Sequence, residues 1–334
     1  MNDAALNSLS DNLLDTLRCQ PIRSYPASQL ATLHNCCPAD ILFAVDLLRR
    51  SGYDIKSGRE ERFRFISAPD LLLAAEITHR LTTSFVGRTV YAYNSVQSTN
   101  SVAGKLAEAK APDGAVVVAE SQTKGRGRMA RPWYSPEQAG IYLSIILYPE
   151  INPADAPGLS IITSLALADT LAGYDPSEIS IKWPNDCLLG GRKTAGILTE
   201  LSADLISVHH VIVGVGVNLN QRRTDFPPEI RRTATSLRAE TKTEIRRVRF
   251  LRRFLKQFEN NYQRFCRSGL KPFRRRILKY SSLLGKNIKL DMQGTIIAGK
   301  AVDIDRNGNL VLETSTGCRT FSAGEVTVVK NHRR

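Results

Sequence analysis

In the central part of the chain, apolar residues follow the pattern of a β-strand in some segments and the period of an α-helix in others. Runs typical of strands lie at residues 114–120, 140–149, 178–189, 194–202 and 208–220, and the run at 158–174 predicts a helix. Because short turns separate consecutive strands, the pattern favours a largely antiparallel, mixed sheet with helices on one face.

Residues 10–66 predict a small unit of their own. After the apolar repeat "LLDTL", two short helices begin at Ser28 and Pro38 around the turn "HNCC", and Gly52 ends the second helix. The alternation of arginine and phenylalanine at 62–65 predicts a strand that follows a Ser-Gly turn. A helix, a helix-turn-helix and a hairpin in this order predict a winged helix.

The end of the chain contains short strands at close spacing and no helix. The runs "KNIKLD", "TIIAGKAVDID" and "NLVLET" predict a small barrel. Asp303, Asp305 and Asn307 resemble the start of a calcium loop, but the twelfth position is Thr314 instead of a bidentate Glu. Residues 305–309 therefore predict a hairpin turn.

Length and composition limit the class of protein. At 334 residues the chain predicts two or three domains, and 42% apolar with 23% charged residues argues against wholesale disorder. Six cysteines without a CxxC pair or a histidine at metal-ligand spacing predict neither a disulfide framework nor a metal site. Since no signal peptide and no run of about 18 apolar residues is found, we expect a soluble, cytoplasmic protein without a membrane partner.

One segment carries most of the net charge of +14. Residues 245–279 contain thirteen Lys or Arg and one acid, Glu259, which gives a net charge of +12. Apolar residues recur at helical period from Phe250 to Phe265, so we predict an amphipathic helix with a solvated arginine face. A surface that binds a polyanion is the alternative interpretation.

A stretch rich in glycine and arginine follows a predicted strand. Gly125 and Gly127 flank Arg126, and Arg128 and Arg131 come next. Backbone amides and guanidiniums can converge there on one anion, and the glycines allow close approach. The stretch lacks the Lys-Ser/Thr of a Walker A loop and the third glycine of a Rossmann fingerprint. We therefore predict a loop that binds phosphate or carboxylate.

Two further segments combine glycines with polar residues. In "IKWPNDCLLGGRKTAGILTE", Lys182, Asn185 and Asp186 stand at a strand end and Lys193 follows a Gly-Gly turn; turn chemistry alone also explains this hairpin. "VGVGVNLN" places two glycines on one face of a strand ahead of Asn218. Such glycines mark the close approach of a ligand or another backbone, and a tightly packed inner strand is the alternative.

Together these segments resemble the biotin protein ligases, most closely the bacterial bifunctional type. The matching motifs are "STN" at 98–100, "AE-Q" at 119–122, "GRGR--R-W-SP" at 125–136, "KWPND" at 182–186, "RK-AGIL-E" at 192–200 and "GVGVN" at 214–218. The resemblance implies an α+β multidomain fold. Its parts are a winged helix-turn-helix domain at 1–66, a class II synthetase-like catalytic domain with a central mixed β-sheet at 67–282, and a small SH3-like β-barrel at 283–334.

The resemblance implies a biotin--[acetyl-CoA-carboxylase] ligase. Such enzymes use ATP with Mg²⁺ to convert biotin into biotinyl-5′-adenylate and pyrophosphate. They then transfer biotin to a lysine of the biotin carboxyl carrier domain of acetyl-CoA carboxylase. Because two anions must meet in the first step, nearby cations are needed to offset their repulsion, which would explain the arginine loop.

Site residues carry over from the resemblance position by position. The implied catalytic residues are Arg128, Lys193, Lys182 and Asp186. The implied biotin contacts are Ser98, Thr99, Asn100, Gln122, Arg126, Gly127, Arg128 and Lys193. The implied nucleotide contacts are Arg126, Arg128, Arg131, Trp133, Asn185 and Asn218. Lys193 would contact the biotin carboxylate, Trp133 the adenine, and Asp186 a metal ion or the incoming lysine.

The resemblance also implies a biotin-responsive repressor that binds operator DNA and forms a homodimer when the adenylate is bound. The second predicted helix is a poor recognition helix, because Asp40 and Asp46 are acidic and Leu42 and Phe43 occupy surface positions. The implied DNA contacts are Arg49, Arg50, Lys56, Arg59, Arg62 and Arg64. A unit that only packs on the ligase domain is the alternative.

Two other functions share these features. One is a transcriptional regulator that senses biotin or its adenylate without ligase activity, although Arg128 and Lys193 favour chemistry over sensing. The other is a lipoate-type ligase on the same fold, although the "GRGR" and "KWPND" motifs favour biotin.

Overall fold

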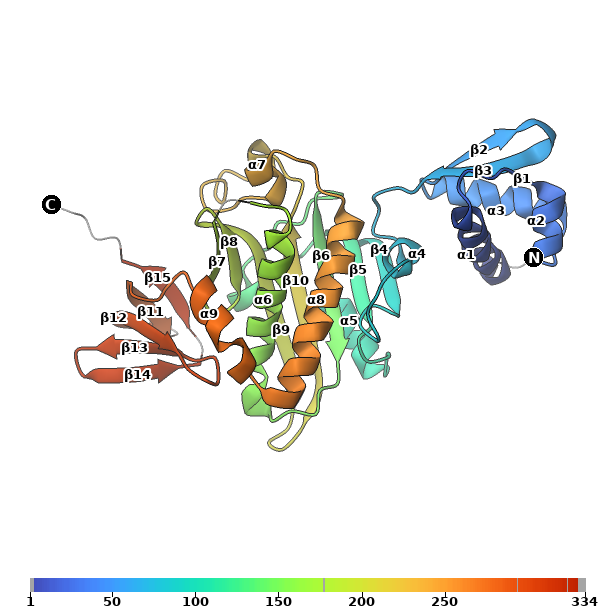
Figure 1. The fold of residues 1–334 in the computed structure, drawn as a ribbon. Helices are drawn as coiled ribbons and strands as arrows, with labels where there is room; N and C mark the ends of the chain where they lie inside the picture. The colour runs from blue at the N-terminus through green and yellow to red at the C-terminus, as the bar shows by residue number, and fades with distance from the viewer. Residues whose placement is uncertain (1–2, 177, 293, 323, 330–334) are drawn as a thin grey trace. The chain divides into compact units, whose positions relative to one another are not determined.

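The computed structural model describes residues 3–176, 178–292, 294–322 and 324–329, and the chain divides into two compact units, Met1–Leu71 and Leu72–Arg334 (Figure 1). The second unit contains a seven-stranded and a five-stranded sheet. Among the described residues, no helix combines the length and apolarity needed to cross a bilayer. All six cysteines are free thiols.

The first unit consists of three helices and a three-stranded antiparallel sheet of order β1-β3-β2. Its elements are α1 (Asp3–Cys19), β1 (Tyr25–Pro26), α2 (Ala27–Leu33), α3 (Pro38–Arg50), β2 (Asp54–Gly58), the 3-10 turn η1 (Arg59–Glu61) and β3 (Arg62–Ser67). The predicted start of α3 is confirmed, whereas α2 begins one residue before Ser28. Pro26 stands at the N-cap of α2, where its fixed φ suits the entry to a helix.

The second unit is centred on a mixed sheet of order β4-β5-β6-β10-β9-β8-β7. Its strands are β4 (Val90–Val96), β5 (Val116–Gln122), β6 (Gly140–Leu147), β7 (Ile179–Lys182), β8 (Asp186–Leu189), β9 (Arg192–Ala203) and β10 (Val208–Asn218). β4 and β5 are parallel, and the other neighbouring pairs are antiparallel. The predicted mixed, largely antiparallel sheet is therefore confirmed.

Helices cover both faces of this sheet, so the prediction of helices on one face is wrong. The helices are α4 (Ala74–Thr78), α5 (Thr99–Glu108), α6 (Pro157–Ala172), α7 (Leu237–Thr241), α8 (Arg247–Ser268) and α9 (Arg274–Tyr280), with 3-10 turns η2 (Arg128–Ala130), η3 (Pro153–Asp155), η4 (Arg223–Asp225) and η5 (Lys271–Phe273). α6 and α8 share a core with Val116 and Ile145, whereas α5 packs against Val117 and Ile146 on the opposite face (Figure 1). The physical reason is that β6 is buried at every position, as expected of a strand covered on both sides.

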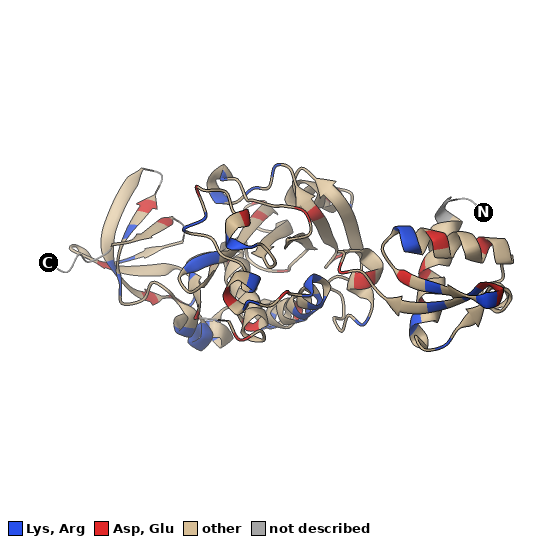
Figure 2. Cartoon of the chain, turned by 90° about the horizontal axis from the view of Figure 1, so that it is seen from above, with Lys and Arg blue, Asp and Glu red and all other residues tan. Residues whose placement is uncertain are grey.

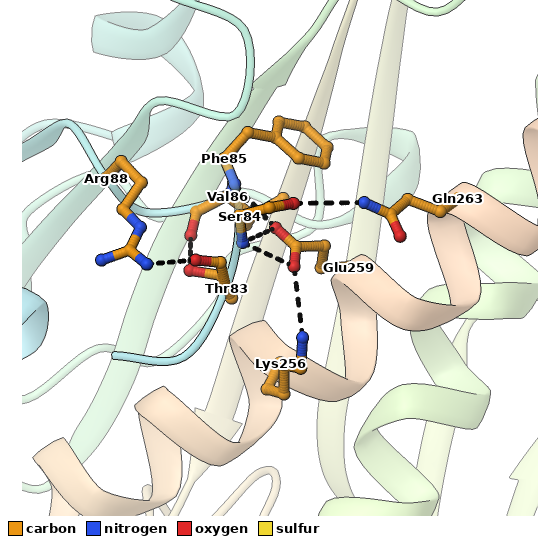
Figure 3. Close-up of polar contacts among 8 residues, drawn as sticks. All are labelled: Thr83, Ser84, Phe85, Val86, Arg88, Lys256, Glu259 and Gln263. Atoms are coloured by element: carbon orange, nitrogen blue, oxygen red, sulfur yellow. Dashed lines mark hydrogen bonds and ion pairs between the residues drawn. The ribbon is translucent and has the colours of Figure 1, made fainter. Parts of the chain in front are cut away.

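The basic segment 245–279 forms α8, η5 and most of α9, and the apolar side chains of α8 pack into the core as predicted. Its one acid, Glu259, is also buried and faces the loop before β4 (Figure 3). The carboxylate accepts the backbone N–H groups of Ser84 at 2.8 Å, Phe85 at 2.9 Å and Val86 at 3.1 Å. Glu259 therefore fixes this loop to the helix.

Replacing Glu259 with glutamine is expected to give a pH-dependent loss of stability. Burial raises the pKa of Glu259, but the backbone donors of Ser84–Val86 and Lys256 outweigh it and hold the pKa below its usual 4.5. The ionised form thus stabilises the folded protein above that usual value, and this contribution is lost as the pH falls through the lowered pKa. At pH 7 we expect Glu259→Gln to reduce the free energy of unfolding by about 2 kcal/mol.

Urea unfolding across pH measures this effect. The deficit of Glu259→Gln should shrink in acid, because the wild-type carboxyl group then protonates. Glu244→Gln, at an exposed position just before α8, is the control and should show no deficit. A deficit that is the same at neutral and acidic pH would contradict the role of the ionised carboxylate.

The second sheet of this unit is antiparallel, with order β14-β13-β12-β11-β15. Its strands are β11 (Asn287–Met292), β12 (Thr295–Ile304), β13 (Leu310–Thr314), β14 (Gly317–Phe321) and β15 (Glu325–Val328). Between β12 and β13, Asp305 Oδ1 accepts the N–H groups of Asn307 at 2.8 Å and Asn309 at 2.9 Å, which confirms the predicted hairpin turn. The Trp183 indole donates to the Gly308 carbonyl at 2.8 Å and so joins this turn to the β7–β8 hairpin.

Candidate functional site

Two glycines of β10 let side chains lie against the backbone of the strand. Gly214 and Gly216 lie on one face of β10, and Gly216 pairs with Gly196 of β9. A Cβ at Gly214 would lie 2.1 Å from Asn100 Oδ1, and one at Gly216 would lie 2.3 Å from Trp133 Nε1. The glycines therefore mark a close approach, here of two side chains of the same chain.

The first turn of α5 forms a buried polar cluster. Gln122 Oε1 accepts the Thr99 backbone N–H at 2.9 Å and the Thr99 hydroxyl at 3.2 Å. The Ser144 hydroxyl lies 2.8 Å from Thr99 Oγ1 and 2.6 Å from Asn100 Oδ1. Ser98, also buried, is the N-cap residue of α5 and makes no side-chain capping hydrogen bond. The structure thus brings together four residues predicted to contact biotin.

Glu200 connects this polar cluster to the arginine loop. Its carboxylate accepts Asn100 Nδ2 at 2.8 Å and lies 3.6 Å from Arg126 Nη2. Arg126 also donates to Ser101 Oγ at 3.1 Å. Because a carboxylate already faces Arg126, this arginine contributes less net positive charge to the site than an unpaired arginine would.

Lys193 lies at the centre of a second cluster. Its Nζ is 2.8 Å from Asp186 Oδ1 and 5.3 Å from the centroid of the Trp133 ring. The backbone of Lys193 is fixed by hydrogen bonds to Thr233 O at 2.8 Å and from Thr235 N at 2.9 Å. The ammonium group is partly exposed, so it retains protons to donate to an anionic ligand.

Arg128 adds a second cation beside this cluster. It donates to Asn185 Oδ1 at 3.3 Å and to the Gly324 carbonyl at 3.4 Å. Burial lowers the pKa of Arg128, while Asp186 and Glu325 oppose that shift. An arginine remains charged in such a setting. With Arg131, which pairs with Glu325, three cations therefore face two carboxylates, which leaves net positive charge where an anion can bind.

The arginine loop is joined to the C-terminal sheet by Arg131, whose guanidinium forms a two-pronged pair with Glu325. Between Arg128 and Arg131, the consecutive residues Met129 and Ala130 have φ values of 55° and 56°. Side chains other than glycine rarely adopt this left-handed conformation, which persists where surrounding contacts hold it. The Arg131–Glu325 pair supplies such a contact.

Releasing this pair is expected to loosen the loop. In Glu325→Gln the charge-assisted pair with Arg131 is lost, and the strained turn at Met129 loses a contact that holds it. Limited digestion with trypsin, which cuts after arginine, should therefore cleave the loop roughly 3- to 10-fold faster, as expected from losing about 1 kcal/mol of local stability. Glu313→Gln, at an exposed position of the same sheet, should digest like the wild type, and equal rates in all three proteins would show that the pair does not restrain the loop.

Several predicted site residues lie elsewhere or are already engaged. Asn218 is buried, and its amide donates to the Thr235 carbonyl at 3.1 Å. Asn185 Nδ2 donates to the Ile197 carbonyl at 2.7 Å, which supports the turn between β7 and β8. Lys182 is half-buried at the end of β7, opposite Asp186 in the β7–β8 register. Gly127 donates its N–H to the Arg131 carbonyl at 2.7 Å within the loop.

The predicted DNA contacts of the first unit fall into two groups. Arg49 donates to the Ile55 carbonyl at 2.6 Å, Arg62 donates to the Ser24 carbonyl at 2.8 Å, and Arg50 pairs with Asp46 at 2.6 Å. These three guanidiniums are therefore engaged within the unit. The remaining three residues are exposed on β2, η1 and β3: Lys56, Arg59 and Arg64.

Three residues of the site were not assigned a role from the sequence. Ser144 is the one serine in the otherwise apolar or aromatic run of β6, and that break in the run is a signal that could have identified it. Glu200 stands inside the matched "RK-AGIL-E" motif, so its position was available although its function was not. Glu325 lies 194 residues after Arg131, and no local pattern links the two.

Comparison with known proteins places these clusters in a family context. Residues 92–218 match the description "Biotin/lipoate A/B protein ligase family", and residues 283–329 match "Biotin protein ligase C terminal domain". The bifunctional ligase/repressor BirA of Bacillus spizizenii is 36% identical over 282 residues, which cover 84% of this chain and 87% of that protein. The biotin--[acetyl-CoA-carboxylase] ligase of Paracoccus denitrificans is 35% identical over 234 residues, which cover 69% and 96%.

A solved structure is similar to this chain in both fold and sequence. The biotin protein ligase of Aquifex aeolicus in complex with biotin and ATP is 31% identical, with a TM-score of 0.63. The match covers 73% of this chain and 100% of that one.

Proposed function

This chain belongs to the biotin protein ligase family, and we propose that it forms biotinyl-5′-adenylate from biotin and ATP and then transfers biotin to a lysine of the carrier domain of acetyl-CoA carboxylase. The observation that carries the proposal is the second cluster. Lys193 Nζ lies over the Trp133 ring and 2.8 Å from Asp186, with Arg128 beside them. This arrangement combines net positive charge with an aromatic surface, which is what an adenylate requires.

In the first step, a carboxylate oxygen of biotin forms a bond to the α-phosphorus of ATP, and the bond from that phosphorus to the bridging oxygen breaks, releasing pyrophosphate. Both reactants are anions, so repulsion opposes their approach. Lys193 and Arg128 would offset this repulsion and stabilise the charge that develops on the transferring phosphoryl group. A compact ammonium suits the biotin carboxylate, whereas the planar guanidinium suits phosphate oxygens.

The polar cluster at the start of α5 is the proposed site for the biotin ring system. Thr99, Asn100 and Gln122 offer hydroxyl and amide groups that can exchange their mutual hydrogen bonds for bonds to the cyclic urea of biotin. Ser98 completes this set, and Arg126 and Gly127 would close over the bound ligand. Closure of the loop would exclude the water that hydrolyses an adenylate.

The nucleotide would lie against Trp133, with Arg131 and Asn185 at its polar edge. The Trp133 ring packs against the backbone of Gly196 and Gly216, so it can present a flat face to adenine. The proposed contact of Asn218 requires its present hydrogen bond to Thr235 to be exchanged when the nucleotide binds.

In the second step, the neutral amine of the carrier lysine attacks the carbonyl carbon of the adenylate, an amide bond forms, and AMP leaves. The amine must first lose a proton, because an ammonium group cannot attack. Asp186 is the proposed acceptor that orients the amine, and Lys182 would hold the departing phosphate.

The residues present are compatible with Mg²⁺ delivered together with ATP. Among the described residues, no group of three or more His, Cys, Asp or Glu side chains could hold a metal ion. Mg²⁺ commonly uses one or two carboxylates together with substrate phosphates, and Asp186 is the carboxylate that fits. Bound there, the ion would neutralise phosphate charge.

Exchange of labelled pyrophosphate into ATP tests the first step without a carrier protein. The proposal predicts exchange that depends on biotin. Exchange that depends on lipoate instead would indicate the lipoate-type ligase, and saturable biotin binding without exchange would indicate a sensor.

We also propose that residues 1–66, which lie within the first unit, form a winged helix that binds operator DNA. Relatives named ligase/repressor and the exposed cations Lys56, Arg59 and Arg64 on the β2–β3 wing support this proposal. The catalytic domain would then span residues 67–282, and the SH3-like barrel would span residues 283–334. The adenylate-bound chain would bind DNA as a homodimer.

Selection of bound sequences from a random duplex library, with and without biotin and ATP, tests the proposed operator binding. We expect enrichment of one two-part sequence only when both ligands are present.

A further inference from the structure

The outward side of α8 carries an unbroken stripe of cationic and polar side chains. The stripe consists of residues spaced three or four apart along the helix: Arg246, Arg249, Arg253, Gln257, Asn260, Arg264 and Arg267. This spacing places all of them on one side, because an α-helix repeats every 3.6 residues. At about 1.5 Å per residue the stripe is about 32 Å long.

The five arginines of the stripe are exposed, and one of them, Arg253, lies close enough to the Asp169 carboxylate of α6 to attract it. Within the described part of the chain, none of them forms an ion pair, and the recurrent basic positions along α8 are visible in Figure 2. Arg264 lies over the Phe273 ring and Arg267 donates Nε to the Gln263 carbonyl, so both retain donors for a ligand. Like charges one turn apart are unfavourable for a helix.

The cations on the inner side of α8 are treated differently. Arg247 pairs with Glu120 at 2.6 Å, Lys256 lies 3.5 Å from Glu259, and Arg252 donates to the Glu76 carbonyl at 3.0 Å. The chain therefore supplies acceptors to the cations that pack against the fold. In the outer stripe, by contrast, Arg267 reaches a backbone carbonyl, and Arg253 lies near Asp169 but forms no ion pair with it among the described residues.

We propose that this stripe binds the phosphate backbone of double-stranded DNA without sequence preference. The partner must be a long polyanion, because the cations extend over several helical turns instead of converging on one point. Arginine dominates the segment 245–279, with ten Arg and three Lys, and its planar fork matches pairs of phosphate oxygens.

The absence of apolar anchors distinguishes duplex DNA from other polyanionic partners. No large apolar side chain is exposed among the described residues of 245–279. Protein interfaces need buried aromatic or aliphatic anchors, single-stranded nucleic acids stack their bases on aromatic rings, and bilayer surfaces take up apolar side chains. A duplex presents only its phosphates and groove edges, which the stripe can contact by charge alone.

Fluorescence anisotropy of a labelled 30-base-pair duplex of random sequence, titrated with the full chain over a range of salt concentrations, tests the proposal. A quadruple variant, Arg249→Gln, Arg253→Gln, Arg264→Gln and Arg267→Gln, should bind at least 10-fold more weakly. Its slope of log affinity against log salt should be smaller by about 2 to 4, since each lost phosphate contact removes about 0.9. None of the four residues lies in the proposed catalytic site, so biotin-dependent exchange should be retained, which also verifies folding.

Two matched variants separate the stripe from other cations. A variant of the C-terminal sheet loses the same net charge at exposed positions: Lys286→Gln, Lys289→Gln, Lys300→Gln and Arg319→Gln. It should keep the wild-type slope. A wing variant with Lys56→Gln, Arg59→Gln and Arg64→Gln should lose slope only for the contacts that the wing makes, so adding the stripe substitutions to it should lower the slope by a further amount of about 2 to 4, about 0.9 for each lost contact. An unchanged slope in the stripe variant, an equal loss in the C-terminal variant, or tighter binding to vesicles of anionic phospholipid than to the duplex would overturn the proposal.

Discussion

Biotin-dependent exchange of pyrophosphate into ATP is expected to fall by about 100- to 1,000-fold when Lys193 is replaced by alanine, the loss typical of removing one donor that stabilises a developing negative charge. The variant removes the ammonium group that lies 2.8 Å from Asp186 and over the Trp133 ring. It also leaves Asp186 beside the reacting anions with less cationic compensation. The exchange rate at saturating biotin and ATP measures the effect.

Two comparisons make this result specific. Lys289→Ala removes an exposed lysine of β11 and should exchange like the wild type. Lys193→Arg keeps the charge but changes the shape of the donor, so it should recover only part of the rate. If Lys193→Ala and Lys289→Ala both exchange pyrophosphate at the wild-type rate, Lys193 does not act on the reacting groups.

The second large effect is expected on stability, from replacing Arg247 with alanine. Arg247 and Glu120 form a buried ion pair at 2.6 Å, and their side chains are 2% and 8% exposed. Glu120 also accepts the Leu72 backbone N–H at 2.7 Å, so it links α8, β5 and the start of the second unit. Removing the arginine leaves a buried carboxylate without its countercharge, which costs about 3 to 5 kcal/mol.

Urea unfolding of the second unit, followed by circular dichroism, measures this loss. Arg249→Ala is the matched control, because it removes an exposed arginine two positions away on the same helix, and its effect should stay within about 0.5 kcal/mol. Similar midpoints for Arg247→Ala and the wild type would show that the buried pair does not hold the helix to the sheet.

The strands and most helices were predictable because the local pattern determines them. The apolar runs of β5, β6 and β10 and the 3.6-residue period of α8 are properties of short segments, and each element formed near its predicted place. The helix α5, which covers the face of the sheet opposite α6 and α8, was not predicted. The apolar residues that the short helix α5 buries fully are the small Ala103 and Ala107, so it lacks the strong apolar stripe that identifies a helix from sequence.

The composition of the site was less predictable than the fold. The motifs identified Trp133, Asp186 and Lys193 as separate pieces, and the fold brings them together, although 53 and 60 residues separate Trp133 from the other two. The partners of the arginine loop depend on how the C-terminal sheet docks on the ligase sheet. Long-range contacts of this kind, such as Arg131 with Glu325, leave no periodic signal in the sequence.

Transfer of biotin to a purified carrier domain tests the central claim most directly. The chain is incubated with biotin, ATP, Mg²⁺ and the biotin carboxyl carrier domain of acetyl-CoA carboxylase, and the carrier is analysed by mass spectrometry. We expect one biotin on a single lysine, formed only when ATP is present. A carrier that remains unmodified, although the chain binds biotin saturably, would contradict ligation and leave a biotin-sensing protein.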